Sequence, residues 1–176
     1  MTLETKFCNG PGTVTVTDGQ VISGYASLFG QSDQGGDSVT AGAYRTSLAK
    51  GRRIRMLWQH DPAQPIGVWD EVREDARGLW VKGRLLTDIA RAREAASLIA
   101  AGAIDGLSIG YRTIRARKDD SGTRHLIDLD LWEVSLVTFP MLPEARIAAK
   151  THPTGADDLR ALAKMFQQAG RAIRQI

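Results

Sequence analysis

Residues 106–139, GLSIGYRTIRARKDDSGTRHLIDLDLWEVSLVTF, decide the fold of this 176-residue chain. Two apolar-patterned segments flank the polar turn DDSG, a pattern that predicts a long β-hairpin. In the first strand, Leu107, Ile109 and Tyr111 share one face, and Ser108 and Gly110 share the other. The Ser108 hydroxyl is therefore expected beside a residue without a side chain, where a substrate backbone could approach it. The plain alternative is a solvent-facing strand serine.

The second strand of this hairpin carries a carboxylate in an apolar pattern. Leu129, Leu131 and Glu133 have the same parity, so a regular strand would turn Glu133 toward the apolar side. A buried carboxylate needs a cationic or hydrogen-bonding partner. His60 is one candidate partner. The alternatives are a β-bulge that turns Glu133 outward, or pairing with one of the many arginines.

His60 lies in the segment WQHDPAQPIG, residues 58–67, where an apolar stretch meets a proline-punctuated turn. Ile54, Met56, Trp58 and His60 share one parity, which predicts that all four lie on one face of a strand. A histidine there is either a satisfied structural group or a working one. With Ser108 and Glu133 it could form a relay of base, nucleophile and orienting carboxylate.

The remaining patterns predict six or more strands, joined mainly by hairpins. We expect strands within 13–29, at 53–60 and at 66–86, a short helix over 42–50, and a helix from the N-cap Thr87 to Ala101. These elements favour an α+β, mainly β fold: a curled antiparallel β-barrel flanked by helices. Residues 1–148 are expected to form one domain, and residues 149–176 a linker followed by an amphipathic helix.

Composition narrows the classes of function. With a net charge of +3 and arginines scattered among acids, the chain is not expected to bind nucleic acid. The single cysteine, Cys8, excludes an intramolecular disulfide and fits a reducing compartment. No stretch approaches the roughly 18 apolar residues of a membrane span, so we expect a soluble intracellular protein. Without metal-ligand or phosphate-loop spacing, neither a metal nor a cofactor is predicted.

Six ordered blocks carry a family resemblance. They are GYASLFG, GAYRTSL, MLWQHDPAQPIG, GLWVKGRLL, GAIDGLSIGYR and WEVSLVTFPMLPEA, between about Ser23 and Ala148. In this order they resemble the prohead (capsid maturation) proteases of tailed bacteriophages, a family similar to the herpesvirus protease assemblin. The resemblance implies a serine endopeptidase in the bacterial cytoplasm, inside the immature capsid. Its substrates would be a scaffold protein or the scaffolding segment of the major capsid protein.

By position, the resemblance implies that Ser108 is the nucleophile and His60 the catalytic base. Glu133 stands where the herpesvirus enzymes place a second histidine, and this departure leaves His125 as a rival third member. The oxyanion donors are implied to lie around Met141 and Leu142. The resemblance also implies self-cleavage, for which the segment between Ala149 and Gly155 is a candidate.

Several alternatives stay open at this point. A catalytically silent capsid-assembly or scaffold-binding factor could keep the same barrel. A β-barrel binding module could use RRIRMLW, residues 52–58, to contact a nucleic acid. A thiol enzyme using Cys8 is a third alternative. A homodimer is compatible with the resemblance, since the herpesvirus relatives dimerise.

Overall fold

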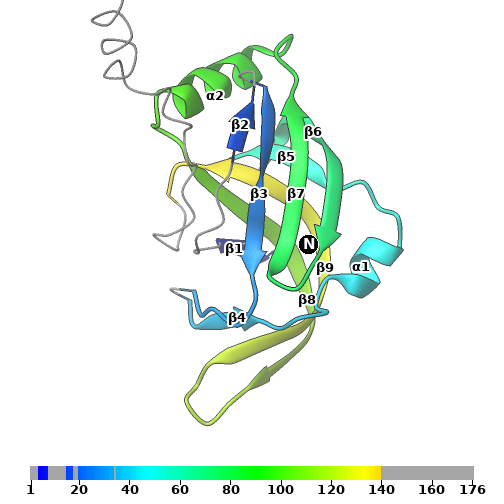
Figure 1. Cartoon of the computed structure of the whole chain (residues 1–176). Coiled ribbons are helices and arrows are strands. Elements are labelled where there is room, and N and C mark those ends of the chain that lie inside the picture. The colour runs from blue at the N-terminus through cyan, green and yellow to red at the C-terminus, as the bar shows by residue number, and fades with distance from the viewer. Residues whose placement is uncertain (1–3, 8–14, 18–19, 34, 140–176) are drawn as a thin grey trace, which may run out of the picture.

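The computed structural model describes residues 4–7, 15–17, 20–33 and 35–139, which form a strongly curled sheet with two helices (Figure 1). The strands are β1 Glu4–Phe7, β2 Thr15–Thr17, β3 Val21–Leu28, β4 Asp37–Val39, β5 Arg55–Trp58, β6 Asp61–Glu74, β7 Gly78–Leu85, β8 Gly106–Lys118 and β9 Arg124–Val137. The helices are α1 Arg45–Ala49 and α2 Ala90–Ala100. The mainly β class and the curled barrel are thus confirmed, although the barrel is only half closed.

The strands are ordered β1-β8-β9-β5-β6-β7-β3-β2, and β4 joins at β9. The three predicted hairpins are confirmed, because β2 pairs antiparallel with β3, β6 with β7, and β8 with β9. A wholly antiparallel sheet was the wrong expectation. Strand β9 pairs in parallel with both β4 and β5. The segment GQSDQGGDS, residues 30–38, has a sequence typical of a loop, but β4 begins within it at Asp37.

The apolar side chains fill the inside of the curl. Leu107 and Ile109 of β8 and Val134 and Leu136 of β9 all belong to this core. Helix α2 lies across one end of the curled sheet, and α1 lies beside β9 (Figure 1). The predicted N-cap was wrong, because α2 begins at Ala90 and has no side-chain cap.

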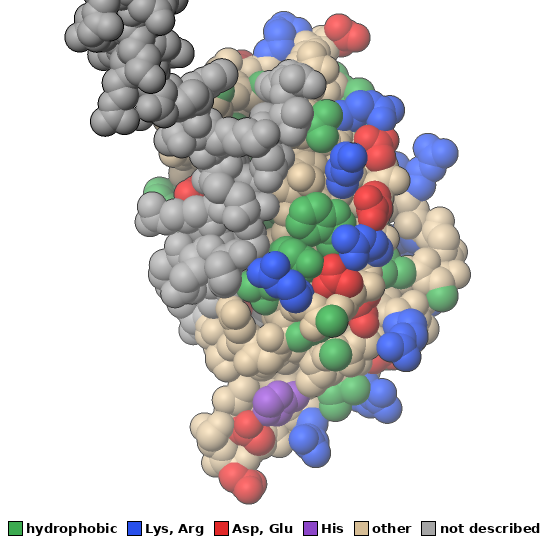
Figure 2. Space-filling model, in the orientation of Figure 1, with side chains coloured by type: hydrophobic (Ala, Val, Ile, Leu, Met, Phe, Trp, Pro, Cys, Tyr) green, Lys and Arg blue, Asp and Glu red, His purple; other side chains and the backbone are tan. Residues whose placement is uncertain are grey.

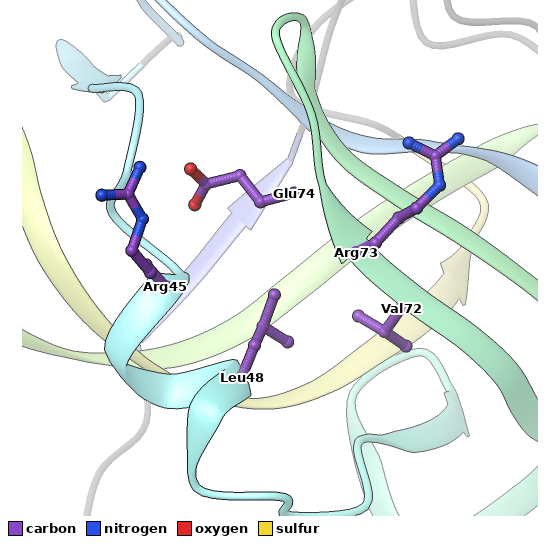
Figure 3. A pocket seen from close by; sticks show the side chains of 5 residues that line it. All are labelled: Arg45, Leu48, Val72, Arg73 and Glu74. Atoms are coloured by element: carbon purple, nitrogen blue, oxygen red, sulfur yellow. The ribbon is translucent and has the colours of Figure 1, made fainter.

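A cavity of about 350 Å³ lies where α1 meets β6. Leu48 and Val72 line it from the helix and the strand, and Glu74 lies across from Arg45 (Figure 3). The Glu74 carboxylate accepts hydrogen bonds from the backbone N–H groups of Gly42, at 2.7 Å, and Tyr44, at 3.0 Å. These bonds fasten the start of α1 to β6, so we interpret this cavity as a structural junction.

Basic and acidic side chains are interspersed on the face drawn in Figure 2. Among the described residues, no helix is long and apolar enough to cross a membrane. The predicted linker and C-terminal helix of residues 149–176 lie outside the described residues, as does the proposed self-cleavage segment.

Candidate active site

Ser108 lies near the start of β8 and pairs with Ser135 of β9 across the hairpin. Its neighbours Leu107 and Ile109 point into the core, so the hydroxyl lies on the opposite face of the sheet. The expectation of an exposed hydroxyl was wrong, because Ser108 has 0% of its surface exposed. Both faces of the sheet are covered here.

A β-bulge in β9 decides where Glu133 points. Tyr111 pairs with Leu131 but Gly110 pairs with Glu133, so Trp132 is an extra residue on the β9 side. The extra residue shifts the alternation by one position. Beyond the bulge, Val134 occupies the core face that Leu131 occupies before it. Glu133 therefore lies on the face of Ser108, and not on the apolar face that a regular strand predicts.

Gly110 provides the space for this carboxylate. A Cβ atom at Gly110 would overlap Oε1, Cδ and Cγ of Glu133. The missing side chain was expected to admit a substrate backbone beside Ser108. In the structure the Glu133 carboxylate occupies that space instead, and only 5% of its side chain is exposed.

His60 does not continue the β5 strand as predicted. The strand ends at Trp58, and Gln59 and His60 adopt left-handed backbone conformations with φ of 51° and 62°. Such values are disfavoured for residues with a Cβ, so they must be supported by the surroundings. The backbone N–H of Gln59 donates to the Leu136 carbonyl at 2.9 Å, which anchors this turn to β9.

The turn brings the imidazole between the other two predicted site residues. His60 Nε2 lies 2.6 Å from Ser108 Oγ, and His60 Nδ1 lies 2.5 Å from Glu133 Oε1. A carboxylate can only accept, so Nδ1 carries the proton and Nε2 is left to accept from the serine hydroxyl. The three predicted residues therefore form one hydrogen-bonded chain, with the tautomer that a general base requires.

A fourth residue joins this chain that the sequence reading did not select. The Ser135 hydroxyl donates to Glu133 Oε2 at 2.5 Å and accepts from the His60 backbone N–H at 3.2 Å. Ser135 lies two residues after Glu133, so it is on the same face of β9. This spacing was the feature of the sequence that could have pointed to Ser135. Its use requires knowing which face of the strand Glu133 occupies, and the bulge at Trp132 makes that face differ from the one a regular strand predicts.

His125, the rival third residue, lies at the far end of the hairpin. It pairs with Arg117 in the sheet, so at about 3.3 Å per residue it lies roughly 30 Å along the hairpin from Ser108. Its Nε2 contacts Asp119 Oδ2 at 2.7 Å. Hydrogen bonds from Ser121 and then from His125 hold the pKa of the Asp119 carboxyl below its ordinary range. The structure thus separates His125 from the other site residues.

Other predicted groups cannot be compared with the structure. Met141, Leu142 and Cys8 lie outside the described residues. Within the described ranges, no three His, Cys, Asp or Glu side chains gather as a metal site would require. The described site presents a hydroxyl, an imidazole and a carboxylate in series.

Comparison with solved structures places the fold. The structure of the capsid assembly protease of bacteriophage T4 superposes with a TM-score of 0.62 at 14% sequence identity, covering 79% of this chain and 97% of that chain. A protease of varicella-zoster virus superposes with a TM-score of 0.44 at 14% identity, covering 70% of this chain and 60% of that one. The T4 match shows a shared fold.

Comparison of sequences then gives the family. Residues 12–157 match the caudovirus prohead serine protease family, and the chain belongs to that family. It is 32% identical over 147 residues to the prohead protease of Enterobacteria phage HK97. The match covers 80% of this chain and 64% of that relative, so the chain spans somewhat less than two thirds of the relative's length.

Proposed function

We propose that this protein is a serine endopeptidase in which Ser108 is the nucleophile, His60 the general base and Glu133 the orienting carboxylate. One observation carries the proposal: the continuous hydrogen-bonded chain from Ser108 Oγ through both ring nitrogens of His60 to Glu133 Oε1. A serine hydroxyl is a weak nucleophile unless an adjacent base takes its proton. Membership of the prohead serine protease family supports this assignment.

In the proposed reaction, Ser108 Oγ attacks a peptide carbonyl carbon while His60 Nε2 takes the hydroxyl proton. A C–O bond forms, and the carbonyl electron pair moves to oxygen. His60 then gives the proton to the departing amine as the C–N bond breaks, leaving an acyl-serine that water hydrolyses by the same steps. Glu133 holds the ring tautomer and stabilises the imidazolium that forms.

Met141 and Leu142 are proposed to supply backbone donors for the oxyanion. Both residues have a backbone N–H that can donate, whereas the flanking Pro140 and Pro143 have no backbone proton to donate. The resemblance to the prohead proteases supports this choice of segment.

The family points to the substrates and the setting. The proposed substrates are a scaffold protein or the scaffolding segment of a major capsid protein, cleaved inside the immature capsid in the host cytoplasm. Self-cleavage between Ala149 and Gly155 and a homodimer are part of the same proposal. Nucleic acid and membranes are not among the proposed partners.

A catalytically silent assembly factor is the second candidate. The complete burial of Ser108 favours it, because a substrate carbonyl cannot reach a hydroxyl that has no exposed surface in this conformation. The hydrogen-bonded chain favours the enzyme, since a binding protein has no need of an imidazole between a hydroxyl and a carboxylate.

Covalent labelling separates the two candidates. The purified protein is incubated with a fluorophosphonate, whose phosphorus is attacked by an activated serine with loss of fluoride to give a stable phosphonyl-serine, and the intact mass is measured. We expect one adduct on Ser108 in the wild type and none in Ser108→Ala or His60→Ala. The control is Ser27→Ala, which removes another fully buried serine hydroxyl, and it should label like the wild type. A wild-type protein that stays unlabelled would support the silent factor.

A further inference from the structure

We infer that Ser135 is a positioning residue for the proposed reaction, an assignment that rests on the proposed function. Its hydroxyl makes two contacts with the site. It donates to Glu133 Oε2 and accepts from the backbone N–H of His60. One side chain thus fixes both the orienting carboxylate and the backbone that carries the base.

The need for such a residue follows from the geometry. The imidazole of His60 contacts Glu133 Oε1. If Oε2 had no partner, the carboxylate would be free to rotate about its terminal bond. His60 and Gln59 are both in left-handed conformations, which require external support. Ser135 has no exposed surface, so water cannot replace its hydroxyl without rearrangement of the sheet.

Ser135→Ala tests this inference against the control Ser27→Ala, whose hydroxyl has no hydrogen-bond partner among the described residues. We expect kcat for peptide cleavage to fall on the order of 10- to 100-fold with little change in KM, because misplacement of a reacting group affects the chemical step. Ser135→Thr, which keeps the hydroxyl, should recover most of the lost rate. Equal kcat in Ser135→Ala, Ser27→Ala and the wild type would overturn the inference.

A second readout does not depend on activity. In the folded wild type, the short bond between His60 Nδ1 and Glu133 should place that ring proton at unusually low field in the NMR spectrum. We expect Ser135→Ala to shift or broaden this signal and Ser27→Ala to leave it unchanged. If neither the wild type nor any variant cleaves peptide, the proposed function fails. The NMR result still decides the role of Ser135. An unchanged signal in Ser135→Ala would overturn that role.

A different observation carries a second inference, about the edge of β8. Strand β1 pairs antiparallel with β8 over four residues, with Phe7 opposite Ser108 and Glu4 opposite Tyr111. The other edge of β8 is paired with β9, so neither edge is open beside the nucleophile. We propose that this β8 edge is a docking site for an extended peptide, and that β1 is a displaceable occupant of it.

The attachments of β1 are few. It is the end strand of the sheet and pairs only with β8. Its described side-chain anchor is Glu4, which accepts from the Thr113 backbone N–H at 3.2 Å and from Arg124 Nη1 at 3.0 Å. An extended peptide that adds a strand to a sheet edge gains main-chain hydrogen bonds of the same kind. Departure of β1 would therefore exchange one strand for another without loss of pairing.

A shortened protein that begins at Thr15 tests this second inference. We expect a fluorescent peptide with the sequence of residues 1–10 to bind the shortened protein and not the full chain, measured by anisotropy. Fluorophosphonate labelling of Ser108 should be at least about 10-fold faster after shortening, since the edge is open in every molecule. A folded shortened protein that neither binds the peptide nor labels faster would overturn the inference.

A point variant covers the case in which the shortened chain does not fold. Glu4→Ala removes the side-chain anchor of β1 and should also accelerate labelling, whereas the control Glu71→Ala alters a surface ion pair with Arg73 and should not. Equal labelling rates in Glu4→Ala and Glu71→Ala would count against displacement of β1. Peptide binding without any labelling would support the docking edge and contradict the proposed enzyme.

Discussion

Ser108 and Ser135 occupy facing positions of the β8–β9 hairpin, and both hydroxyls contact His60. Ser108 Oγ meets the ring of His60, and Ser135 Oγ meets its backbone N–H. Both serines lie on the sheet face opposite the apolar core, which the register of β8 and β9 fixes. The proposed site is therefore built mainly on two paired strands, with one turn added.

Ser108→Ala should abolish peptide cleavage while the fold is kept. Loss of the nucleophile of a serine protease lowers kcat on the order of 10⁶-fold, which places the variant below detection. The substitution removes one buried hydroxyl and its hydrogen bond to the imidazole, so the free energy of unfolding should change by about 1 kcal/mol. Thermal unfolding by circular dichroism and a peptide-cleavage assay measure the two effects. Cleavage at the wild-type rate would remove Ser108 from the reaction.

Glu133→Gln tests the third residue against its rival. The amide is similar in size, but it cannot stabilise an imidazolium as a carboxylate does, so kcat should fall about 10³- to 10⁴-fold. His125→Ala should leave cleavage unchanged, because His125 contacts Asp119 far along the hairpin. Steady-state kinetics of both variants measure this contrast. A large loss in His125→Ala with an unaffected Glu133→Gln would reverse the assignment.

Asp130 gives a prediction about stability and pH. Burial opposes ionisation of its carboxyl, but hydrogen bonds from Arg52 and Lys50 outweigh burial and hold its pKa below the ordinary value of 3.8. Because the folded-state pKa is lowered, the carboxylate stabilises the fold above pH 4, and this contribution is lost as the pH falls through the lowered pKa.

The variant Asp130→Asn should accordingly be less stable than the wild type at pH 7, by about 1–3 kcal/mol. The difference should shrink steadily below about pH 4, as the wild type becomes protonated. Urea unfolding of both proteins between pH 7 and pH 3 measures the difference. A gap that stays constant across this range would show that the charge of Asp130 does not contribute.

Gly110→Ala should damage the site although it replaces none of the polar residues of the site. The new methyl would overlap the Glu133 carboxylate, which would have to move away from His60. We expect a loss of about 1–3 kcal/mol in stability from overpacking and a fall in kcat. The comparison variant is Gly102→Ala at the end of α2, where φ is +71° and no atom lies within 4 Å of the added Cβ. Gly102→Ala should cost stability through backbone strain and leave kcat unchanged.

The sequence predicted the parts of this fold that depend on local patterns. Alternating apolar residues and polar turns identified the hairpins. The residue patterns and the family resemblance together led to the hypothesis that Ser108, His60 and Glu133 form the site. A β-bulge was one of the alternatives considered for Glu133, but the sequence could not decide for it or locate it at Trp132, because no residue type in the strand marks the extra residue that moves Glu133 to the other face. The parallel pairing of β5 with β9 joins segments distant in sequence and leaves no periodic signal. The left-handed turn at His60 was missed for a similar reason, since its support comes from β9.

The fit between Gly110 and Glu133 makes the two positions thermodynamically coupled. A methyl at position 110 is harmful only while a long carboxylate fills the same space, so its cost depends on the residue at position 133. In a double-mutant cycle, Gly110→Ala should cost less when combined with Glu133→Ala than it costs alone, giving a coupling energy of about 0.5–3 kcal/mol. The residue at position 133 therefore limits which substitutions are tolerated at position 110. A side chain at position 110 becomes tolerable only after a shorter side chain has replaced Glu133.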